Sequence, residues 1–152
     1  MLSAYYQLAA KREAMGIPAL PLTAKQTEEL TLLLQEPSIE KSSDLIHLLS
    51  ERVPPGVDEA AYVKATWLRT IAQEEVTSPL ITPLEATRLL GTMIGGYNVT
   101  ALIELLKNKK EALANCAAQA LSKTLLVYDG MNDVMDLAKI NPFAQKVLEN
   151  WA

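Results

Sequence analysis

The sequence predicts an all-α protein in which about eight short helices stack as antiparallel pairs, the arrangement of an α-solenoid. The chain of 152 residues is 49% hydrophobic but only 5% aromatic, so its core must consist mainly of Leu, Ala, Val and Ile. Leu and Ala are strong helix formers. Apolar stripes at helical spacing alternate with turns marked by Pro and Gly, and each helix pair must bury its stripe against the next pair.

Three helices are predicted in the first third of the chain. Ser3 is the expected N-cap of the first, which runs to about Met15 and ends at Gly16. The spacing of Thr23 and Gln26 predicts a capping box, in which each side chain bonds the other residue's backbone N–H. A leucine face follows and stops before a proline: Leu30, Leu33, Leu34 and Pro37. A third apolar stripe precedes the next proline turn: Leu45, Ile46, Leu48 and Leu49.

The middle of the chain carries the clearest helix start signals. Asp58 is a predicted N-cap, and the buried stripe of its helix consists of Ala61, Ala65, Leu68 and Ile71 or Ala72. Thr82, Pro83 and Glu85 occupy the cap, first and third positions of a helix expected to reach about Leu90.

Three further helices are predicted after a segment rich in glycine. They cover residues 101–106, 111 to about 128, and 142–151, the last restarting at Asn141 and Pro142. Small residues in the long middle helix should permit close helix approach: Ala114, Ala117 and Ala118. Together these elements predict a single HEAT-like domain over residues 1–152. A compact irregular bundle is the structural alternative, because no repeat of fixed period is visible.

Composition excludes several classes of function. The net charge is −4 and the pI is near 5.0, whereas nucleic-acid binders carry a basic field that neutralises phosphates. The one basic cluster, Lys107 with Lys109 and Lys110, is interpreted as a solvated loop. No apolar window approaches the ~20 residues that span a bilayer. A single cysteine and the lack of a secretory signal favour the reducing cytoplasm.

No catalytic or metal-binding residue is predicted. His47 is the only histidine, and its apolar neighbours favour a partly buried structural role. Cys116 lies among alanines, where a lone cysteine behaves as a small hydrophobe. The glycines around residue 95 match no phosphate-loop spacing, and residues 129–133 lack the spacing of an EF-hand.

The turns contain the candidate interaction residues. Structural turns are expected at Pro54, Pro55, Gly56, Gly91, Gly95 and Gly96, where glycine permits positive φ and close backbone approach. Three polar or aromatic residues beside these turns are the predicted partner contacts, because rigid loops on a helical scaffold commonly bind other proteins: Arg52, Tyr97 and Asn98.

The same turns carry a resemblance to a known family. Residues 52–65, RVPPGVDEAAYVKA, are similar in order and spacing to a segment near the start of bacterial aconitase B (aconitate hydratase 2). Residues 78–83, 89–98 and 120–126 are similar to later segments of that family. The similarity extends over essentially the whole chain and resembles the family's N-terminal HEAT-like domain.

The resemblance implies a non-catalytic module of a longer protein. In that family this domain is expected to mediate dimerisation and protein contacts and to shape access to the active site. Its partners would be the aconitase B catalytic core or a second copy of itself, and other metabolic enzymes. The family interconverts citrate and isocitrate with a [4Fe–4S] cluster held by cysteines of the core, so no catalytic residue and no cofactor carries over to this chain. Two alternatives stay open: a stand-alone regulatory or scaffold paralogue, and an RNA-binding regulator.

Overall fold

The computed structural model describes residues 2–36, 42–124 and 130–152. Within these residues the regular secondary structure consists of α-helices and one π-helical turn, with no strand. This result confirms the predicted all-α fold. The helices are α1 Ser3–Ala14, α2 Ala24–Gln35, α3 Ser42–His47, α4 Glu59–Ala72, α5 Pro83–Leu90, α6 Val99–Leu105, α7 Glu111–Ser122, α8 Gly130–Ala138 and α9 Pro142–Trp151, and the π-helical turn η1 is Leu48–Arg52.

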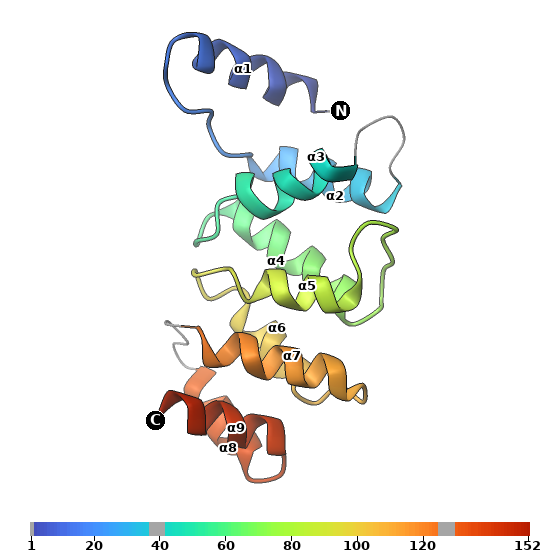
Figure 1. Cartoon of the computed structure of the whole chain (residues 1–152), viewed down its shortest axis with the longest axis vertical. Helices are drawn as coiled ribbons and strands as arrows, with labels where there is room; N and C mark the ends of the chain where they lie inside the picture. The colour runs from blue at the N-terminus through green and yellow to red at the C-terminus, as the bar shows by residue number, and fades with distance from the viewer. Residues whose placement is uncertain (1, 37–41, 125–129) are drawn as a thin grey trace.

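The helices form two stacked layers along the long axis of the molecule (Figure 1). The layer nearer the viewer contains α3, α5, α7 and α9, and the layer behind it contains α2, α4, α6 and α8. Consecutive helices pair across the layers, as in α4 with α5 and α8 with α9, while α5, α7 and α9 pack in series within one layer. The serial stacking of pairs is consistent with an α-solenoid.

Local chemistry starts four of these helices where the sequence predicts. The Thr23 hydroxyl accepts from the Gln26 N–H, and the Gln26 side chain accepts from the Thr23 N–H, which completes the capping box before α2. Asp58 caps α4, and Thr82 caps α5 with proline at its first position. Asn141 accepts from two backbone N–H groups at the start of α9. Each cap satisfies donors that the helix itself leaves without a partner.

Other predicted boundaries are wrong. Ser3 does not cap α1, because the helix already begins at that residue and its N-cap, Leu2, makes no side-chain bond. The third helix widens after His47 into the π-helical turn. The long helix ends at Ser122, although the prediction carried it to Tyr128, a residue outside the described part of the chain. Helix α8, Gly130–Ala138, has no counterpart among the predicted helices.

The core is built from leucine and alanine, as the composition predicts. Fully buried side chains of the α2, α4 and α5 helices include Leu30, Leu34, Ala61, Leu68 and Leu90. Burial of one leucine side chain contributes roughly 1.5–3 kcal/mol, so a continuous row of them accounts for the stacking. Helix α7 packs against α5, α6 and α9, and its small residues Ala114, Ala117 and Ala118 are buried.

Candidate interaction surface

Two turns lie side by side at one edge of the stack, at the left of Figure 1, and glycine makes their contact possible. The backbone N–H groups of Ile94 and Gly95 donate to the carbonyl oxygen of Pro55, at 2.9 and 3.2 Å. A Cβ atom at Gly95 would lie 1.9 Å from the carbonyl oxygen of Gly56, which no side chain could tolerate. Gly96 has φ +96°, a conformation that favours glycine.

Tyr97 is fixed at this junction by its ring and by its hydroxyl. The hydroxyl donates to the carbonyl oxygen of Val57 at 2.8 Å. The ring meets the Tyr62 ring edge to face, with centroids 5.4 Å apart and planes at 76°, a geometry that aromatic pairs prefer. The two tyrosines therefore join the glycine-rich loop before α6 to the N-terminal end of α4.

Four large apolar side chains stay exposed around this contact, and we name them the turn surface: Val57, Tyr62, Ile94 and Tyr97. Their exposed fractions are 69%, 57%, 62% and 40%. Tyrosine is enriched at protein interfaces because it combines large contact area with a polar group. Hydrogen bonds between the turns hold these residues in place, so little conformational freedom would be lost when a partner binds.

Asn98 does not project from the glycine turn. Its side chain is fully buried, and its amide nitrogen donates to the carbonyl oxygens of Leu90 and Met93 at 2.6 and 3.2 Å. Its amide oxygen has no hydrogen-bond partner among the described residues. Asn98 thus joins the end of α5 to the start of α6. Because its side chain is buried, the neighbouring Tyr97 is the residue of this pair that a partner could touch.

The Arg52 side chain forms its hydrogen bonds with the N-terminal segment. Its guanidinium donates to the Tyr5 hydroxyl at 3.0 Å and to the carbonyl oxygens of Ala19 and Leu20 at 2.7 and 3.2 Å. The Arg52 carbonyl accepts from the Leu22 N–H at 2.8 Å. These bonds tie α1 and the segment after it to η1. The structure does not bring Arg52 together with Tyr97, and the role of either residue as a partner contact stays a prediction.

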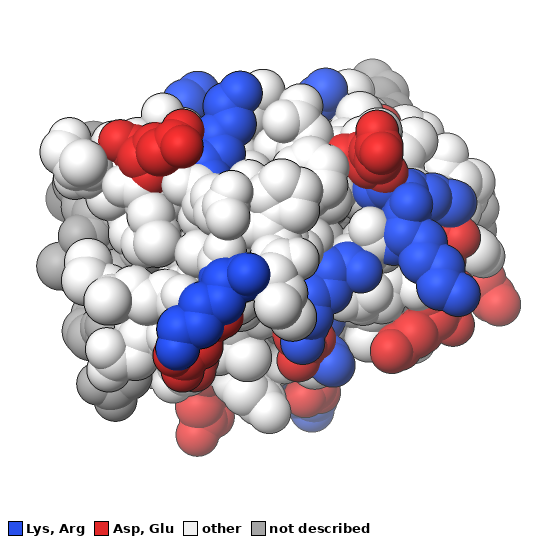
Figure 2. All heavy atoms as spheres, turned by 90° about the horizontal axis from the view of Figure 1, so that it is seen from below, with Lys and Arg blue, Asp and Glu red and all other residues white. Residues whose placement is uncertain are grey.

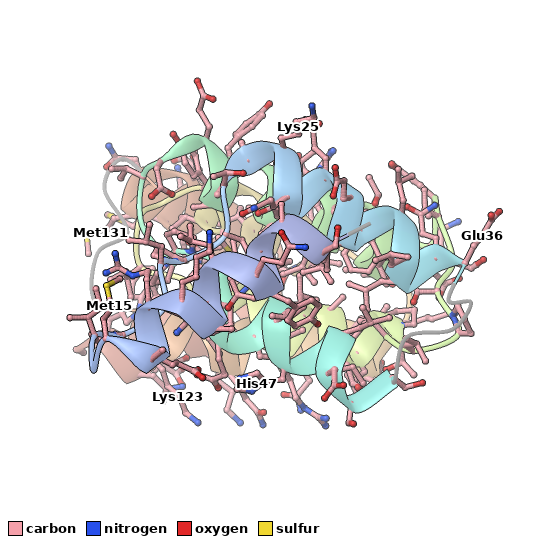
Figure 3. The ribbon with its side chains drawn as sticks, turned by 90° about the horizontal axis from the view of Figure 1, so that it is seen from above. Met15, Lys25, Glu36, His47, Lys123 and Met131 are labelled. Carbon is pink, nitrogen blue, oxygen red and sulfur yellow. The ribbon has the colours of Figure 1, made fainter. Side chains whose placement is uncertain are left out.

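The remaining sequence candidates lie elsewhere. His47 is exposed and projects from the side of the molecule formed by α3 (Figure 3), so its predicted partial burial is wrong. Cys116 is buried, and this burial raises the pKa of its thiol, while Arg88 opposes the rise. In the basic cluster, Lys107 and Lys109 are exposed, and Lys110 forms an ion pair with Glu74.

Sequence reasoning missed the rest of the turn surface and one buried cation. Val57 and Ile94 gave no signal, because only tertiary contact brings the turns together. Lys64 is 1% exposed. Its position did carry a signal: it lies three residues after Ala61 and four before Leu68, on the predicted apolar stripe of α4.

The lower end of the stack, formed by α8 and α9, carries charged side chains. Figure 2 shows that end with Lys, Arg, Asp and Glu side chains interspersed among uncharged ones and with no large area of one charge sign. Three apolar side chains of the last described segment are exposed: Met131, Met135 and Ile140.

The described residues offer no ligand set for an iron–sulfur cluster. Such a cluster takes three or four cysteine thiolates, and Cys116 is the only cysteine of the sequence. No group of three His, Cys, Asp or Glu side chains could hold a metal ion within the described ranges. Likewise, none of the helices in those ranges has the length and apolarity that a bilayer span requires.

The fold and the turn surface define a class: an all-α domain of serially stacked helix pairs that displays exposed aromatic residues at its turns. Comparison with known sequences makes the assignment particular. Residues 4–152 match the family described as Aconitate B N-terminal domain. The chain is 57% identical to aconitate hydratase B of Synechocystis sp. over 152 residues, 50% to that of Escherichia coli over 153, and 43% to that of Helicobacter pylori over 152.

These alignments cover 100%, 100% and 99% of this chain and 18% of each relative. The chain therefore belongs to the aconitate B N-terminal domain family, as the resemblance of its turn motifs implied. It spans about a fifth of the length of the curated relatives that it matches.

Proposed function

We propose that this chain is a non-catalytic interaction module of an aconitase B-type protein. Through the turn surface it binds the catalytic remainder of such a protein or a second copy of itself, and it borders the access to the active site. The proposed parent activity is that of the relatives, aconitate hydration, with the iron–sulfur cluster held outside this chain. The proposed location is the cytoplasm, whose reducing conditions suit a free thiol such as Cys116.

The observation that supports this proposal is the exposure of two tyrosines and two aliphatic side chains on turns that are rigidly joined. Scattered exposed apolar residues are normal on a protein surface, but a contiguous group held by hydrogen bonds is typical of a binding site. Tyr62 and Tyr97 are exposed and packed edge to face against each other, so they are the expected anchors of the contact.

Sedimentation of the purified chain over a wide concentration range tests the proposal. We expect the chain to self-associate, or to bind a separately produced catalytic remainder, and we expect the Tyr62→Ser and Tyr97→Ser variants to weaken that association at least tenfold. Leu32→Ser is the matched control, because Leu32 is 57% exposed on α2 and lies outside the turn surface.

The pattern of losses decides the outcome. Equal losses in all three variants would indicate general destabilisation and argue against the turn surface. Association with neither partner, or association that the tyrosine variants leave unchanged, would refute the proposed role.

A further inference from the structure

Lys64 is a largely buried lysine whose ammonium faces a cavity and pairs with no described residue. The side chain extends from α4 and is 1% exposed, and it makes no hydrogen bond or ion pair within the described part of the chain. Lysine is almost never fully buried unless it is paired, because a charge removed from water loses its hydration. Burial lowers the pKa of Lys64 to about 8, and the carboxylate of Glu51 partly opposes this shift.

The side chain lines a cavity of about 490 Å³ between η1, the Pro55 turn and the end of α5. Its walls combine two chemical characters. Three apolar residues form one part: Val53, Pro55 and Leu89. The polar part consists of Lys64 with Ser50, Glu51 and Thr92. The Thr92 hydroxyl donates to the Leu89 carbonyl oxygen at 2.6 Å, so Ser50 supplies the available hydroxyl donor.

A second cavity adjoins the first at Thr92 and adds further positive charge. It has a volume of about 280 Å³, and Arg88 and Lys123 line it. Neither forms an ion pair within the described residues. Lys123 projects from the same side of the molecule as His47 (Figure 3), the side of α3, α5 and α7. Three cations and one carboxylate, Glu51, thus line the two cavities together.

We propose that the Lys64 cavity is a binding site for a short aliphatic carboxylate. The carboxylate group pairs with the Lys64 ammonium and accepts from the Ser50 hydroxyl, while the alkyl chain lies against the apolar wall. An anion at this position supplies the charge partner that the buried ammonium lacks. Glu51 remains exposed and outside ion-pair distance of Lys64, so it tunes the affinity for an anion without filling the site.

The charge pattern also predicts selectivity. A dicarboxylate of sufficient length reaches from Lys64 toward Arg88 and Lys123 in the adjoining cavity, and it gains a second favourable charge contact. A neutral alcohol or an alkylammonium of equal length gains no charge contact, and the ammonium is repelled. Affinity should therefore fall in the order succinate, butyrate, butanol, with no binding of butylammonium.

Titration of the 152-residue chain at pH 7 with these four probes tests the proposal, with binding followed by calorimetry and by amide chemical shifts. Lys64→Met should weaken butyrate binding at least tenfold, and Glu51→Gln should strengthen it severalfold by removing the competing carboxylate. Lys123→Met should weaken the binding of succinate and leave the affinity for butyrate unchanged. Lys25→Met is the matched control, because Lys25 is exposed on the far side of the molecule (Figure 3).

Two results would overturn the proposal. One is the absence of any Lys64-dependent butyrate binding at 50 mM, with the amide chemical shifts of residues 50–55 and 89–92 unchanged. The other is a Glu51→Gln variant that binds butyrate no better than the wild type and is less stable. That result would show that Glu51 turns inward in solution and is itself the partner of Lys64. Circular dichroism of each variant verifies that the helices are retained.

Discussion

Replacement of Lys64 by methionine should stabilise the chain at neutral pH. Methionine has nearly the volume and shape of the lysine stem but carries no charge. The Lys64 side chain is 1% exposed and its ammonium forms no ion pair among the described residues, so the folded chain hydrates this charge less well than the unfolded chain does. The cost appears directly in the pKa, which burial lowers from the ordinary 10.5 to about 8.

The magnitude and its pH dependence follow from linkage. At 1.36 kcal/mol for each pKa unit, the lowering corresponds to a penalty of about 3 kcal/mol. Below pH 8 both the folded and the unfolded chain hold the Lys64 proton, and the whole penalty acts. As the pH rises from about 8 to 10.5 the folded chain releases the proton first, so the penalty diminishes. Above 10.5 neither state is protonated at Lys64 and the penalty is gone.

Urea unfolding of the wild type and of Lys64→Met at pH 7 and pH 10 measures this effect. The variant should be more stable by about 3 kcal/mol at pH 7 and by less than about 1 kcal/mol at pH 10. Titration of other groups cancels in the difference between the two proteins. Lys25→Met should change stability little and equally at both pH values. An advantage of Lys64→Met that does not shrink at pH 10, or a loss of stability at pH 7, would refute the assignment of a buried unpaired charge.

Two further predictions concern the junction of the turns. Gly95→Ala should destabilise the fold by about 2–3 kcal/mol, because its Cβ would overlap the Gly56 carbonyl, whereas Gly56→Ala meets nothing within 4 Å and should change the free energy of unfolding by less than about 1 kcal/mol; similar urea midpoints for the two would contradict the close approach. Asn98→Ala should cost about 2 kcal/mol by calorimetric unfolding, since two carbonyl oxygens lose their donor, and a loss below about 0.5 kcal/mol would show that water replaces the amide.

The sequence specifies helix starts better than helix ends. A cap such as Thr23 or Asp58 bonds an N–H group three residues away, so the interaction is visible within one short window. The end of α7 has no such signal. Its apolar spacing continues toward residue 128, yet the helix ends at Ser122 with Lys123 as C-cap. Helix α8 has apolar residues at helical spacing, but it also contains a glycine and two acidic residues, so the sequence pattern did not predict a helix there.

The candidate sites divide in the same way. Sequence analysis selected Tyr97 because aromatic residues in glycine-rich turns are typical of contact sites, and the structure places Tyr97 on an exposed surface. It selected Asn98 for the same reason, although that side chain is buried. Neighbours in sequence can thus lie on opposite sides of a turn. Contact between residues 55–57 and 94–97 is tertiary, and no local pattern could predict it.

Both proposed sites depend on one short turn. The Pro55 carbonyl oxygen accepts from the Ile94 and Gly95 N–H groups and so holds the two turns together, and Pro55 also lines the Lys64 cavity. Tyr62 and Lys64 lie two residues apart on α4, one exposed at the turn surface and the other directed into the cavity. Because the two sites share this turn, linkage requires that any change a partner at the turn surface makes in carboxylate affinity at Lys64 is matched by an equal change in partner affinity when the carboxylate binds.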